Sequence, residues 1–132
     1  MKLLRYGPAG QEKPGLMDND GNIRCLAEHV EDINGSALSD EAIATLRELD
    51  TDSLPLVDGN QRLGPCVGGV GKFLCIGLNY SDHAAESGMP LPSEPEVFTK
   101  ATSAICGPDD NIVQPLNSDK LDWEVELAIV IG

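Results

Sequence analysis

Short apolar runs alternate along this chain with glycine, proline and acidic residues, and their periods differ. The run KLLRY at 2–6 predicts a strand, and GLMDNDGNIRCL at 15–26 predicts a hairpin that turns at Asp20-Gly21. LSDEAIATLRELD at 38–50 has the helical period: Ser39 can cap it, and an apolar stripe follows at Ile43, Leu46 and Leu49. The first half of the chain therefore predicts a small α+β unit.

The segment LPLVDGNQRLGPCVGGVG at 54–71 is rich in turn residues and predicts a linker. We place a domain boundary at its end, which divides the chain into 1–69 and 70–132. The motif GGVGK at 68–72 is not a phosphate-binding loop. Cys66 stands where the first glycine would be needed, and Phe73 stands where serine or threonine would follow the lysine.

Beyond the linker, KFLCIG at 72–77 predicts a buried strand and YSDHAAES at 80–87 a short helix, capped by Asn79 or Ser81. Gly88 and Pro90 end this helix. PEVFTK at 95–100 and NIVQP at 111–115 predict further strands on either side of a Gly-Pro turn at 107–108. DWEVELAIVIG at 122–132 has the strongest strand pattern in the chain.

Two pairs of residues in this second half have spacings that suit catalysis. His83 and Glu86 lie three positions apart in the predicted helix, so the carboxylate can orient the imidazole as a base that activates water. A solvated surface pair is the alternative. Glu124 and Glu126 lie on one face of the last predicted strand, where Mg²⁺, Mn²⁺ or Ca²⁺ would offset their repulsion. An exposed sheet face is the alternative there.

The overall charge narrows the choice of partners. The formal net charge of −13 repels nucleic acid and acidic membrane surfaces, so neither is expected as a partner. No apolar run approaches the ~20 residues of a membrane span, and no secretory leader pattern opens the chain. The four cysteines contain no C-x-x-C pair and are expected to be free thiols. Together these features predict a cytoplasmic protein.

Three motifs in order resemble the fumarylacetoacetate hydrolase family: KFLCIGLNYSDHAAESG at 72–88, PEVFTKATSAICGP at 95–108 and DWEVELAIVIG at 122–132. MKLLRYG and KPGL near the start resemble the N-terminal domain of many bacterial members. The resemblance implies that an N-terminal α+β domain precedes the first part of a mixed β-roll catalytic domain. It also implies a homo-oligomer, expected to be a dimer.

By this resemblance, Glu124 and Glu126 are metal ligands and His83, supported by Glu86, is the general base. Lys100 would offset charge on the substrate or oxyanion, while Tyr80 and Asn79 would line the pocket. Family members act on small 2-oxo or dioxo acids.

The implied reaction is metal-dependent hydrolysis of a C–C bond in a 2,4-dioxo, diketo-deoxy sugar acid. Isomerase, decarboxylase or ureidoglycolate lyase activity, and a fragment without activity, remain alternatives. The family's catalytic domain continues past the position of Gly132. We therefore expect the chain to be the N-terminal portion of a member, through truncation, processing or an incomplete gene, and a third acidic metal ligand to lie outside it.

Overall fold

The computed structural model describes all 132 residues and contains both helices and strands, which confirms the α+β class. By its internal contacts the chain divides into two compact units. One unit contains Met1–Gly69 together with Cys106–Gly132, and the other contains Val70–Ile105. The predicted division into an N-terminal domain at 1–69 and the start of a β-roll catalytic domain at 70–132 stays a prediction.

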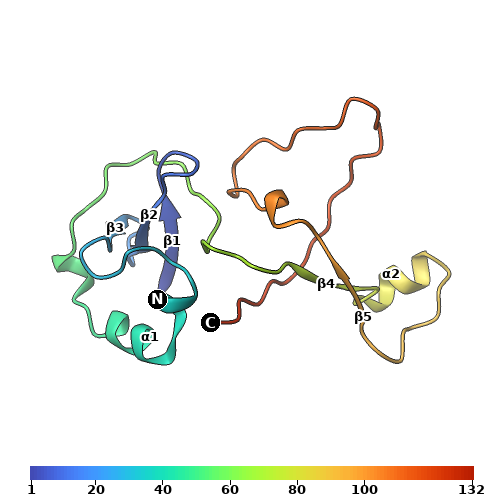
Figure 1. Cartoon of the computed structure of the whole chain (residues 1–132), viewed down its shortest axis with the longest axis horizontal. Helices are drawn as coiled ribbons and strands as arrows, with labels where there is room; N and C mark the ends of the chain where they lie inside the picture. The colour runs from blue at the N-terminus through green and yellow to red at the C-terminus, as the bar shows by residue number, and fades with distance from the viewer. The chain divides into compact units, whose positions relative to one another are not determined.

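The first unit is organised around an antiparallel sheet in the order β1-β2-β3 (Figure 1), formed by Lys2–Tyr6, Lys13–Met17 and Ile23–Cys25. The predicted hairpin turn is confirmed. Asp18 Oδ1 accepts hydrogen bonds from the backbone N–H groups of Asp20 (3.0 Å) and Asn22 (2.8 Å). Such a side-chain turn holds the two strands in register.

The linker covers both edges of this sheet. Leu56 forms an antiparallel bridge with Arg24 on β3, and Leu63 forms one with Tyr6 on β1. The sequence predicted this segment only as a loop. Because its backbone pairs with both outer strands, it satisfies hydrogen-bonding groups that would otherwise be exposed at the sheet edges.

Helix α1, Asp40–Arg47, contributes Leu46 to the buried cluster that also contains Leu16 of β2. The Ser39 side chain accepts a hydrogen bond from the Ala42 backbone N–H (3.2 Å), as predicted for the cap. The short 3₁₀ turns η1, Gly35–Leu38, and η2, Thr51–Ser53, flank this helix. The buried apolar cluster consists of Leu16, Leu26, Ile33, Leu46 and Leu54.

The second unit is a smaller hairpin. Strands β4, Leu74–Gly77, and β5, Glu96–Thr99, pair antiparallel, and helix α2, Ser81–Glu86, lies between them in the chain (Figure 1). The 3₁₀ turn η3, Thr102–Ala104, follows β5. Gly88, with a φ of 66°, follows the end of α2 in the left-handed conformation that suits glycine after a helix. The two predicted strands and the predicted helix are confirmed, but the expectation that β4 is buried was wrong, since Leu74 and Ile76 are exposed.

Three predictions about local structure were wrong. Neither 111–115 nor 122–132 forms a strand, and every residue from 111 to 132 is exposed. A strand pattern becomes a strand only where a second strand accepts its hydrogen bonds, and none does so here. The cap of α2 is Tyr80, with no side-chain hydrogen bond, rather than Asn79 or Ser81.

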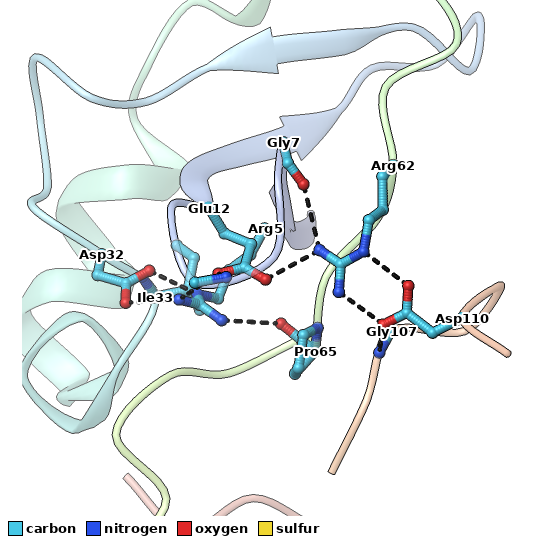
Figure 2. A network of polar contacts seen from close by, with 10 residues as sticks. Arg5, Gly7, Glu12, Asp32, Ile33, Arg62, Pro65, Gly107 and Asp110 are labelled. Atoms are coloured by element: carbon cyan, nitrogen blue, oxygen red, sulfur yellow. Dashed lines mark hydrogen bonds and ion pairs between the residues drawn. The ribbon is translucent and has the colours of Figure 1, made fainter. Parts of the chain in front are cut away.

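A network of ion pairs joins distant parts of the first unit (Figure 2). Arg62 Nη1 donates to Glu12 Oε1 (2.9 Å), and the Nε and Nη2 of Arg62 donate to the two carboxylate oxygens of Asp110, each at 2.6 Å. Arg5 lies 3.6 Å from Glu12 and makes a bidentate pair with Asp32 at 2.7 and 3.1 Å. Two guanidinium groups thus alternate with three carboxylates.

The hydrogen bond from Arg62 lowers the pKa of Glu12, and the amide of Gly10 and the charge of Arg5 act in the same direction. A carboxyl group with a lowered pKa in the folded state stabilises the fold above its unfolded pKa, and this contribution is lost as pH falls through the folded value. We therefore expect the denaturant midpoint to fall on acidification below about pH 4, and to fall less steeply in Glu12→Gln.

The matched control is Glu28→Gln, because Glu28 is exposed and makes no ion pair. Its midpoint should follow that of the parent chain over the same pH range. A Glu12→Gln curve that also runs parallel to the parent would show that Glu12 has no such role.

Candidate active site

The junction between β4 and α2 carries the first group of predicted site residues. Leu78 connects the two elements with a φ of 47°, the left-handed conformation that a leucine rarely adopts. Asn79 and Tyr80 follow it, and both are exposed. Leu78 is the first of three residues between the end of β4 at Gly77 and the start of α2 at Ser81. Strain of this kind is concentrated at functional sites in proteins.

His83 and Glu86 lie on α2, as predicted, and both are exposed. Their spacing puts them on neighbouring positions of the helix surface. No direct hydrogen bond joins the two side chains, and their proposed catalytic pairing stays a prediction. Asp82 Oδ1 instead accepts a hydrogen bond from the His83 backbone N–H (2.9 Å). The pair is therefore near in position but not engaged.

Lys100 lies at the other end of the hairpin. Its backbone N–H donates to the carbonyl oxygen of Phe73 (3.1 Å), just before β4 begins. The length of β4 separates this end from Asn79 by roughly 13 Å, at ~3.3 Å for each residue. The hairpin therefore gathers Asn79, Tyr80 and His83 at one end and places the backbone of Lys100 at the other.

Glu124 and Glu126 belong to the other compact unit and lie in the exposed stretch 111–132. The expectation that they lie on one face of a strand was wrong, because the strand does not form. Their two carboxylates provide the oxygen donors that a hard divalent cation prefers. No group of three histidine, cysteine or acidic residues gathers in the structure as a candidate metal centre. The donor chemistry of the two carboxylates fits such a cation.

Sequence reasoning missed two features near these residues. The strain at Leu78 had a signal, since only a few residues connect the end of the apolar run KFLCIG to the helix that follows. The sequence signal for the ion pairs of Arg62 was weaker. It consists of isolated charged residues among glycines and prolines in three segments, GPAGQEKPG, NQRLGPC and GPDDN. Spacing along the chain does not show which of these charges meet.

Comparison with known proteins finds a family match in the second half of the chain. Residues 72–132 match the family described as fumarylacetoacetate (FAA) hydrolase C-terminal. This match confirms the resemblance to the fumarylacetoacetate hydrolase family that was seen in the motifs of this segment.

The whole chain is also similar to longer bacterial proteins. It is 64% identical over all 132 residues to proteins of Burkholderia ambifaria and Burkholderia lata, and 63% identical to one of Burkholderia cenocepacia. Each of these relatives is named "Putative hydrolase". The chain spans about half the length of these relatives, 47% in each case.

The left-handed conformation of Leu78 can be tested by substitution. Asparagine tolerates a positive φ, whereas β-branched threonine does not, so Leu78→Thr should be less stable than Leu78→Asn by about 1 kcal/mol. The measurement is amide hydrogen exchange of the β4–β5 ladder. The same two substitutions at Leu74, inside β4, should rank in the opposite order, because threonine suits a strand. If threonine and asparagine ranked in the same order at both positions, Leu78 would not be a strained residue.

Proposed function

We propose that this chain carries part of the active site of a metal-dependent hydrolase that cleaves a C–C bond in a small 2,4-dioxo acid. One observation carries the proposal: the segment that matches the family, 72–132, contains every predicted site residue. These residues are Asn79, Tyr80, His83, Glu86, Lys100, Glu124 and Glu126. The family and the names of the relatives support a hydrolase, and the substrate class follows from the resemblance.

His83 acts as the general base in this proposal. A base must take a proton from the water that attacks the substrate carbonyl, and an imidazole does so efficiently near neutral pH. Glu86, three positions along α2, orients the ring once the two side chains engage and stabilises the imidazolium that forms. Their exposure on α2 leaves His83 accessible to a small substrate.

The remaining residues bind and orient the substrate. The ammonium group of Lys100 offsets negative charge on the substrate carboxylate or on the oxyanion that forms during attack. Asn79 and Tyr80, at the strained junction, offer hydrogen bonds to the oxygens of a dioxo acid. Hydrogen bonds to the substrate need exposed polar groups near the base, and Asn79 and Tyr80 are exposed close to His83 in the chain.

Glu124 and Glu126 would hold the divalent ion, as Mg²⁺, Mn²⁺ or Ca²⁺. When bound, such an ion supplies a Lewis acid that withdraws electrons from the dioxo group. Within this chain, the two glutamates provide the negative charge that attracts the cation, and a third acidic ligand would come from outside residues 1–132.

Related chemistry provides the alternatives. Isomerase, decarboxylase or lyase activity on similar acids uses the same kinds of residues, and a chain without activity is a further possibility. Product analysis separates them: hydrolysis adds one water to the substrate, decarboxylation releases carbon dioxide, and isomerisation leaves the mass unchanged. Lyase activity releases two fragments without adding water.

His83→Ala tests the proposed base. The substitution is best made in a chimaera in which this chain replaces the matching 47% of the Burkholderia ambifaria relative. We expect turnover of a 2,4-dioxo acid with Mg²⁺ to fall about 100- to 10,000-fold, the usual contribution of a general base. Calorimetric titration should show nearly unchanged metal affinity.

His29→Ala is the matched control, since His29 is the chain's other histidine and is exposed in the N-terminal segment. It should leave turnover unchanged. Loss of metal binding in His83→Ala would make His83 a ligand instead of the base. If His83→Ala and His29→Ala changed turnover to the same extent, His83 would not be the general base.

We also propose a cytoplasmic homo-oligomer. Apart from the proposed substrate, the expected partner is therefore a second copy of the chain. The four cysteines are free, which supports a reducing compartment. None of the helices has the length and apolar character of a membrane span.

The stretch 123–131 exposes large apolar side chains, among them Trp123, Val125, Leu127, Ile129 and Ile131. An exposed apolar stretch of this kind favours association.

Lysine substitutions test this association. Leu127→Lys with Ile129→Lys should shift the chain from an associated form to a monomer in sedimentation velocity. The change lowers the net negative charge of −13, so increased repulsion between copies could not explain the result. Ile112→Lys with Leu116→Lys, which are exposed outside this stretch, should leave association unchanged. A monomeric parent chain would contradict the proposal.

A further inference from the structure

The strongest feature outside the proposed active site is the environment of Arg62. Four of its N–H groups have acceptors: two on Asp110, one on Glu12, and the carbonyl oxygen of Gly7 at 3.1 Å from Nη1. Arg62 precedes the segment that matches the family, whereas Asp110 lies within it. One side chain therefore links the N-terminal sheet to the family segment (Figure 2).

The sheet side of this link is fixed. The Glu12 side chain is only 6% exposed, and its other oxygen accepts a hydrogen bond from the Gly10 backbone N–H (3.1 Å). Arg5 approaches Glu12 from β1 and continues to Asp32, whose Oδ1 also accepts from the Ile33 backbone N–H (2.8 Å). Glu12 cannot move without exposing several paired groups, so it holds Arg62 in place.

The other side of the link is a single turn. Asp110 accepts a hydrogen bond from the Gly107 backbone N–H (2.7 Å), and the Asp110 backbone N–H donates to the Gly107 carbonyl oxygen (3.2 Å). Gly107 is buried, and a β-carbon there would overlap the carbonyl oxygen of Leu63. The turn thus contacts the linker through its backbone as well as through the ion pair.

The two ends of the link differ in protection. The side chains of Arg62 and Asp110 are 28% and 24% exposed, against 6% for Glu12. Every residue that follows the turn, from 111 to 132, is exposed. Segments with few buried contacts open locally at lower free energy than the core. The pair between Arg62 and Asp110 is therefore the place where this link would part first.

We propose that Arg62 is a latch through which the N-terminal sheet holds the turn 107–110 of the family segment in one conformation. The latch opens and closes while the sheet stays folded. The N-terminal residues thus set the position of a loop at the start of the stretch that carries Glu124 and Glu126. This role does not depend on the proposed reaction.

Amide hydrogen exchange of the complete chain tests the latch. In Arg62→Met, the amides of Gly107 and Asp110 should exchange ~10- to 100-fold faster, the range expected when a hydrogen bond to a charged group is lost. The β1–β2 ladder should keep its protection. Arg47→Met is the matched control, because Arg47 is exposed on α1, and it should change neither region. Unchanged exchange at Gly107 and Asp110, or an equal increase throughout the ladder, would overturn the proposal.

Two further variants test the latch, one by removing the carboxylate of Asp110 and one by keeping the charge of Arg62 without its bidentate contact. Asp110→Asn leaves the pair between Arg62 and Glu12 intact and should accelerate amide exchange at Gly107 and at position 110, while the β1–β2 ladder is unaffected. It decides the matter if Arg62→Met unfolds the whole chain. Arg62→Lys keeps the charge but cannot make the bidentate contact, so its exchange should lie between those of the parent and Arg62→Met. Full protection in Asp110→Asn would overturn the latch.

Discussion

A carboxylate that is almost completely removed from solvent is the constraint on which the first unit depends. Burying Glu12 without partners would cost several kcal/mol, so the chain must bring cations to it. Arg5 from β1 and Arg62 from the linker meet this need. Each arginine then recruits a further carboxylate, Asp32 or Asp110. The position of the linker and of the turn at 107–110 follows from the need to neutralise one buried charge.

Structure that depends on neighbouring residues could be predicted from the sequence. The hairpin at Asp18–Asn22, the cap at Ser39 and the short helix that carries His83 are encoded within a few positions each. Their hydrogen bonds join residues close in the chain, so pattern and turn chemistry suffice. The residues of the candidate site were likewise selected from short motifs in the segment that matches the family, and their roles stay predictions.

Structure that depends on distant partners could not be predicted. The pattern at 122–132 favours a strand, but alternation gives only a preference for extended backbone and provides no neighbour to pair with. Arg62 and Asp110 lie 48 positions apart, and nothing in their local sequence selects one of the chain's 22 acidic residues as the partner.

The linker pairs with β3 through Leu56 and with β1 through Leu63, so the six residues at 57–62 must pass from one outer edge of a three-stranded sheet to the other. The number of residues in between is therefore set by the width of the sheet. Apart from Arg62, the identity of the residues at 57–62 can vary more freely among homologous chains than their number. A deletion there would uncover one strand edge, and an insertion would have to bulge outward near Asn60, which already adopts a φ of 67°. Loop length in this segment is thus a measure of sheet width.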